Sequence, residues 1–155
     1  MFVPRVRCGR CQRTDAVLPA FVVLRRLDVA ESVGAAVGEV AGGLSGVRPA
    51  AARLDVPYAT ARDWVRRFAA RSARLAVAFA ALAAELGGEV VVAAGAAGAL
   101  AAIVAAFGAA SGLAGWAALG CWRFASAVSG GSLIGTNTDP LYLIVGRRRF
   151  MPPVP

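Results

Sequence analysis

The sequence contains no histidine, no lysine and only three cysteines. The lack of histidine excludes the most common catalytic base in proteins, and it also removes the residue that completes many zinc sites. Three cysteines, of which one is isolated, do not form a disulfide framework, and we therefore expect a reducing, cytoplasmic compartment. The first ten residues, "MFVPRVRCGR", have no apolar run after their charges, which argues against a secretory signal.

Acidic residues are also scarce, and the sequence places no group of them where catalysis would need one. A metal-dependent nuclease holds its divalent cation with several carboxylates. In the second half of the chain the acidic residues are Glu85, Glu89 and Asp139, and none has a supporting motif around it. The sequence also lacks a serine-nucleophile motif and a phosphate-binding glycine loop of the right form. We therefore predict that the chain is not an enzyme.

All of the side-chain positive charge comes from arginine, and it is concentrated in the first half. The seventeen arginines outnumber nine acidic residues, which gives a formal net charge of +8. Residues 1–74 hold thirteen of the arginines and six of the acids, whereas residues 75–155 hold four and three. Such a charge favours polyanions or an anionic membrane surface as partners. We expect the N-terminal half to carry the basic surface.

A Cys-x-x-Cys motif, Cys8 and Cys11, lies between residues 5–7 and 16–24, which we predict to be short strands. A structural zinc ion needs four ligands, normally two such pairs or one pair with two histidines. The third cysteine, Cys121, lies in an apolar context that is typical of a small core residue. Cys8 and Cys11 therefore form an incomplete metal site. We predict no bound cofactor, with zinc bound only if a second Cys pair is supplied.

Helical spacing begins after residue 28. Valines and alanines recur on one face over residues 29–41, and Gly42 with Gly43 ends the segment, so we predict a first helix there. Asp28 and Glu31 have the spacing of a capping box, with Asp in place of the usual Ser or Thr.

The stretch "GVRPAAARLDVPYATARDWVRRF", residues 46–68, carries the sharpest signal. Val47, Ala50, Ala51 and Leu54 predict a short helix, and the set Ala61, Trp64, Val65 and Phe68 predicts a longer one beginning near Tyr58. Asp55 occupies the turn position where glycine is common, and aspartate tolerates left-handed backbone better than most residues. A short helix, a tight turn and a longer helix are typical of a helix-turn-helix, whose second helix enters the major groove of DNA.

The outer face of the longer helix suits DNA. We predict the DNA-binding residues to be Tyr58, Ala59, Thr60, Arg62, Asp63, Arg66 and Arg67. In this hypothesis the arginines contact phosphates or guanine edges, while Tyr58 and Thr60 help to set the register. Arg71 and Arg74 extend the basic stripe. The alternative interpretation is an amphipathic helical hairpin whose arginine face is only solvated.

With these motifs the chain resembles a family of actinobacterial transposase-type proteins, in which a small zinc ribbon precedes a helix-turn-helix of the form "RPAAARLDVPYATARDWVRRF". The resemblance covers most of residues 5–75. It returns in "WRFASAVSGGSLIGTNTDP", residues 122–140, which is similar to the closing segment of that family. The resemblance implies a DNA-binding module derived from a mobile element, or a regulatory fragment, with double-stranded DNA as partner.

The resemblance also bears on the incomplete metal site, because the ribbon of that family carries an earlier Cys-x-x-Cys upstream. We interpret "RCGRC" as the surviving half of a zinc knuckle. Either the start codon is assigned too far downstream, or the gene is a decayed copy. A third option is that two chains pool their Cys8 and Cys11 pairs around one metal ion.

The second half of the chain is rich in alanine and glycine. Residues 69–86 are predicted to extend the longer helix or to follow it closely, with an apolar stripe for core or homodimer contact. Residues 90–122 contain no charged residue and exceed the length of about 20 that spans a membrane. The alternative function is therefore a small membrane protein with a hydrophobic helical segment and a basic cytoplasmic head. Six glycines between 95 and 120 and the scarcity of strongly apolar residues favour a helical segment packed on the N-terminal domain.

These observations predict a mainly α protein: a degenerate zinc-ribbon remnant, a three-helix helix-turn-helix unit, and then Ala/Gly-rich helices. We divide the chain into a truncated half ribbon at 1–26, a helix-turn-helix domain at 27–75, an Ala-rich helical region at 76–145, and a basic Pro-rich tail at 146–155.

Overall fold

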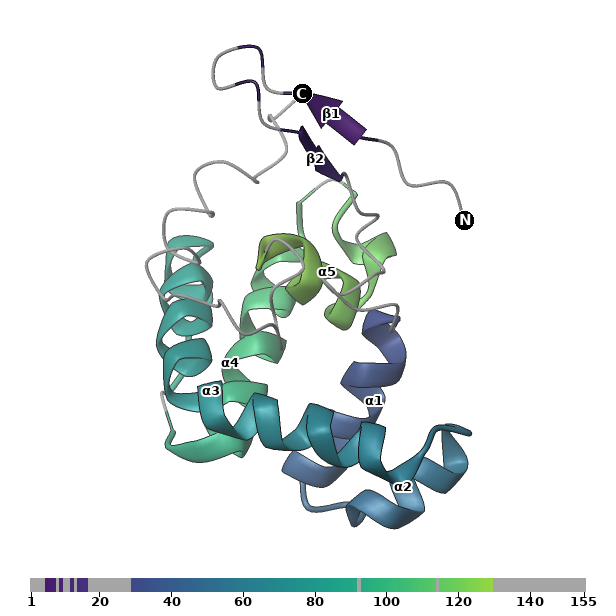
Figure 1. Ribbon diagram of the computed structural model, residues 1–155. Helices are drawn as coiled ribbons and strands as arrows, with labels where there is room; N and C mark the ends of the chain where they lie inside the picture. The colour runs from purple at the N-terminus through teal and green to yellow at the C-terminus, as the bar shows by residue number, and fades with distance from the viewer. Residues whose placement is uncertain are drawn as a thin grey trace.

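The protein is mainly helical in the computed structural model, which describes residues 5–7, 9, 12, 14–16, 29–91, 93–113 and 115–129. Figure 1 shows the helices gathered around a common interior, with a short two-stranded hairpin beside them. The mainly α fold class predicted from the sequence is confirmed.

The hairpin pairs β1 (Arg5–Arg7) with β2 (Thr14–Ala16) in antiparallel register, with Arg5 opposite Ala16 and Arg7 opposite Thr14. The first strand lies where it was predicted. The second begins at Thr14, two residues before the predicted start, and most of the predicted range lies outside the described residues. Cys8 and Cys11 also lie outside them, so their predicted metal site is not described.

The next three helices have the expected order and nearly the expected limits. They are α1 (Ala30–Ala41), α2 (Val47–Arg53) and α3 (Tyr58–Glu85). The predicted capping box is wrong, because the residue before α1 is Val29, which makes no side-chain cap. Glu31 instead forms an ion pair with Arg123, which lies 92 positions later in the chain.

Helix α3 is one continuous helix of 28 residues that passes through the predicted domain boundary after residue 75. Its two parts run in different directions in Figure 1, the first beside α1 and α2 and the second beside α4 (Gly95–Ala110). The predicted apolar face is buried at Ala61, Trp64 and Phe68 in the first part and at Ala76 and Phe79 further along, while Val65 is half-buried. One helix therefore joins the predicted DNA-binding unit to the Ala-rich region.

Helix α4 and the second part of α3 pack closely at some points, because small alanines and glycines lie there among the larger buried side chains. Gly88, just after α3, lies against Ala105 and Ala109 near the end of α4, and a Cβ built on Gly88 would be 2.8 Å from that of Ala109. Since the ends of the two helices meet, this part of α3 and α4 run in the same direction. The buried alanines of this part of α3 are Ala76, Ala78, Ala80 and Ala83, and those of α4 are Ala99, Ala102, Ala106 and Ala110.

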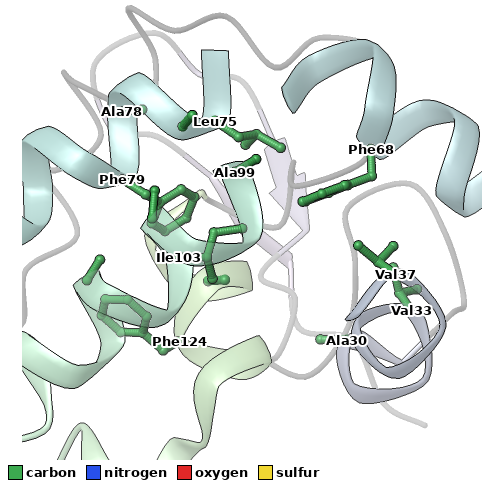
Figure 2. Packing of buried hydrophobic residues seen from close by; sticks show 14 of the residues in the cluster. Ala30, Val33, Val37, Phe68, Leu75, Ala78, Phe79, Ala99, Ile103 and Phe124 are labelled. Carbon is green, nitrogen blue, oxygen red and sulfur yellow. The ribbon is translucent and has the colours of Figure 1, made fainter. Parts of the chain in front are cut away.

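Aromatic and aliphatic side chains fill the remaining interior (Figure 2). Phe79 of α3, Ile103 of α4 and Phe124 of α5 (Cys121–Val128) point toward one another, while Phe68 lies beside Val33 and Val37 of α1. The ring of Phe124 meets that of Trp116 edge-on with centroids 5.2 Å apart. Burying each of these phenylalanines contributes about 1.5–3 kcal/mol, so a few large residues compensate for the small alanines.

The uncharged segment 90–122 is not one helix. It contains α4, the 3₁₀ turn η1 (Ala117–Leu119) and the first residues of α5. Among the helices of the described residues, none combines the length and the apolar character needed to cross a membrane.

Candidate nucleic-acid interface

The connection between α2 and α3 is a tight turn built around Asp55. Its φ of 51° places it in the left-handed region, as predicted for this position. The chain is held there by backbone hydrogen bonds, from Asp55 N to the carbonyl of Ala52 at 3.3 Å and from Val56 N to that of Ala51 at 3.1 Å. Helix α3 then starts after Pro57, which has no side-chain cap. The turn therefore sets the position of the first residues of α3 relative to α2.

Tyr58, the first residue of α3, is flanked by two arginines from different helices. The guanidinium carbon of Arg48, on α2, lies 5.4 Å from the centroid of the ring, and that of Arg62, one turn further along α3, lies at 5.8 Å. At exposed sites each such cation–π contact contributes about 0.5–1 kcal/mol. The three side chains are exposed, so this cluster presents two positive charges and an aromatic ring to solvent.

Asp63 organises the next two arginines. Its Oδ1 accepts a hydrogen bond from Nη2 of Arg66 at 2.8 Å, and its Oδ2 accepts one from Nε of Arg67 at 2.7 Å. The Arg66 side chain stays 75% exposed, whereas Arg67 is 28% exposed and held along the helix. Asp63 therefore limits where both guanidinium groups point and offsets part of their charge.

The structure brings the predicted DNA-binding residues onto one exposed region of α3. Ala59 and Arg62 are exposed, and Thr60 is half-buried beside them. Trp64 and Phe68, on the other side of the helix, are each 1% exposed and anchor α3 on the core. The helical phase predicted from the apolar spacing is therefore confirmed.

Arg48 is a member of this cluster that the sequence analysis missed. It lies ten positions before Tyr58 and on another helix, so no helical spacing connects the two residues. A signal was nevertheless available, because the first helix of a helix-turn-helix crosses the DNA backbone and a cation near its start would be well placed there.

The surroundings of two other ionisable groups shift their pKa values. Burial lowers the pKa of Arg71, and the charges of Arg67 and Arg74 lower it further. Burial also raises the pKa of the half-buried Cys121 thiol, as expected for a core cysteine. Within the described residues there is no group of three or more histidine, cysteine or acidic side chains able to hold a metal ion.

Comparison with known proteins assigns neither a family nor a function to this chain. No family model, no curated protein and no solved structure matches this chain.

Proposed function

We propose that this chain binds double-stranded DNA, with α2 and α3 acting as a helix-turn-helix inside the unit formed by α1 to α3. The observation that carries the proposal is the cluster of Arg48 and Arg62 around Tyr58, because α2 and α3 there present positive charge together at the start of the longer helix. Two helices that converge on one basic surface can hold a phosphate backbone while the longer helix approaches the base edges.

Local electrostatics support binding at this end of α3. The first turn of α3 contains no acidic residue. The N-terminal end of a helix carries a partial positive charge and free N–H groups, both of which favour phosphate. Arg62 and the largely exposed Arg66 follow on the next turns, where they can reach phosphates or guanine edges. Thr60, two residues after Tyr58 and half-buried, is a candidate for setting the register.

The proposal concerns binding alone, in line with the sequence-based prediction that the chain is not an enzyme. Its origin in a mobile element, as the transposase-type resemblance implies, is part of the same proposal. The proposal also includes the half ribbon at 1–26. There, Cys8 and Cys11 would need a second Cys pair to hold zinc tightly.

Duplex binding measured over a range of salt concentrations tests the proposal. We expect the protein to bind a 20-base-pair duplex, and we expect Arg62→Gln combined with Arg66→Gln to weaken binding. The slope of log affinity against log salt should fall by about 1–2, since each neutralised phosphate contributes roughly 0.9. Helicity should not change, because neither side chain belongs to the buried set.

Arg5→Gln combined with Arg7→Gln is the matched control, because it removes the same charge from exposed residues of β1. Its slope should change less than that of the α3 variant. Unchanged affinity and slope in a natively helical Arg62→Gln, Arg66→Gln protein would show that this face of α3 does not contact DNA.

A further inference from the structure

The outward side of the first part of α3 carries residues that share one face of the helix. They recur three and four positions apart and are Ala59, Arg62, Asp63 and Arg66. Trp64, on the inner side of the same helix, is 1% exposed and packs on the core. Ala59 presents only a methyl group, and Asp63 is half-buried. Arg62 and Arg66 are therefore the long exposed side chains of this face.

Arg62 lies among positive charges. Its guanidinium carbon is 5.8 Å from the centroid of the Tyr58 ring, and that of Arg48 is 5.4 Å from the same centroid. The first turn of α3 contains no acidic residue. The two arginines thus bring two positive charges to the side of α3 that adjoins α2, and the first helix of a helix-turn-helix crosses the DNA backbone. Because phosphate binding is driven by charge, these surroundings suit a phosphate.

Arg66 has different surroundings, because a carboxylate offsets part of its charge. Its Nη2 donates to Oδ1 of Asp63 at 2.8 Å, and Nε of Arg67 donates to Oδ2 of the same carboxylate at 2.7 Å. The three side chains together carry one net positive charge, spread over two guanidinium groups. The carboxylate also repels a phosphate that approaches Arg66. Arg66 is therefore less suited to a phosphate than Arg62 is.

A guanine edge asks for hydrogen-bond donors and not for net charge. Its O6 and N7 are uncharged acceptors that lie side by side in the major groove, and arginine can bond both of them at once. A guanidinium group has five N–H donors. The bond to Asp63 involves only Nη2 of Arg66, and this side chain is 75% exposed. The donors that Arg66 retains therefore match a guanine base.

We infer that Arg66 is the residue of α3 that reads a guanine, whereas Arg62, together with Arg48, holds the phosphate backbone. This inference rests on the proposed function and adds to it which side chain determines the base sequence.

Two single variants, Arg62→Gln and Arg66→Gln, test this division, because each removes one charge from an exposed side chain of the same helix. Each protein selects duplexes from a pool of 20-base-pair DNAs with a randomised centre, and its salt slope is measured on one unselected duplex. Arg66→Gln should lose a guanine preference of the parent, a change of roughly 5- to 140-fold in relative affinity. Its slope should change by less than about 0.5, whereas Arg62→Gln should keep the guanine preference and lose about 0.9 of slope.

A modified base tests the contact itself. Replacing the selected guanine with 7-deazaguanine removes the N7 acceptor and leaves O6 in place. The parent and Arg62→Gln should bind the modified duplex about fivefold more weakly or worse, because one charge-assisted hydrogen bond is lost. Arg66→Gln should bind both duplexes equally, since it no longer contacts N7.

Other outcomes overturn defined parts. A lower slope with an unchanged base preference in Arg66→Gln would place Arg66 on a phosphate, which would overturn the inference and leave the proposed function intact. Loss of the guanine preference in Arg62→Gln instead would reverse the two roles and overturn it as well. So would a parent protein that binds duplexes without any base preference. A parent protein that binds no duplex would overturn the proposed function itself.

Discussion

Trp122 of α5 lies directly against Gly34 of α1, so closely that a methyl group on residue 34 would overlap the indole ring. Gly38, one turn further along α1, lies beside the same ring, with its nearest indole atom 3.7 Å from a built Cβ. Arg123, next to this tryptophan, forms an ion pair with Glu31 of the same helix. Helix α5 is thus attached to α1 by one flat ring on two glycines and by one ion pair beside them.

Gly34→Ala should destabilise the protein. Forcing extra atoms into a packed contact costs about 1–3 kcal/mol, while the higher helix propensity of alanine returns up to about 1 kcal/mol. Gly38→Ala is the matched control and should be neutral or stabilising, because its new methyl group makes an ordinary contact. Urea unfolding followed by circular dichroism gives both values. Equal stability of the two variants would show that Trp122 does not pack on α1 as described.

Trp64→Ala should be among the most damaging single changes. The side chain is 1% exposed on the inner face of α3, and removing a buried tryptophan costs about 3–5 kcal/mol. Val77→Ala on the same helix is the control, because Val77 is 58% exposed and its loss should cost less than about 0.5 kcal/mol. Thermal melting distinguishes them. A Trp64→Ala protein that melts like its parent would mean that the helical phase of α3 is wrong.

Asp55→Ala should be about 1 kcal/mol less stable than Asp55→Gly, because the left-handed backbone at this turn disfavours a Cβ. Both variants remove the carboxylate, so the comparison isolates the backbone effect. Unfolding free energies from denaturant titration provide the measurement. If the alanine and glycine variants are equally stable, the turn between α2 and α3 does not hold this residue at positive φ.

Asp63→Asn should separate DNA binding from stability. Its carboxylate bonds Arg66 and Arg67, so its loss should lower stability by roughly 0.3–1 kcal/mol. Duplex binding at low salt should tighten, about twofold or more, since a negative charge leaves the proposed binding face. Glu89→Gln, beyond the end of α3, removes the same charge elsewhere and should leave affinity nearly unchanged. Weaker binding by Asp63→Asn would mean that Asp63 contacts DNA directly or positions its arginines for contact.

The sequence by itself determined the local order of this protein. The spacing of Ala61, Trp64 and Phe68 predicts both a helix and its buried face, because residues three and four apart always share a side of an α-helix. The left-handed turn at Asp55 was also predictable from local sequence, because the backbone conformations that a residue tolerates depend mainly on its own side chain. These features depend on neighbours in the chain and not on the fold around them.

Tertiary packing decided the relationships that join distant segments. Helical periodicity extends only along one helix, so it could not show that Arg48 would meet Tyr58 or that Glu31 would pair with Arg123 instead of capping α1. It also could not show where segment 90–122 would break, because alanine and glycine give almost no periodic contrast between a buried face and an exposed one. Those outcomes follow from which surfaces fit together, as Trp122 fits only against a helix that has glycine at position 34.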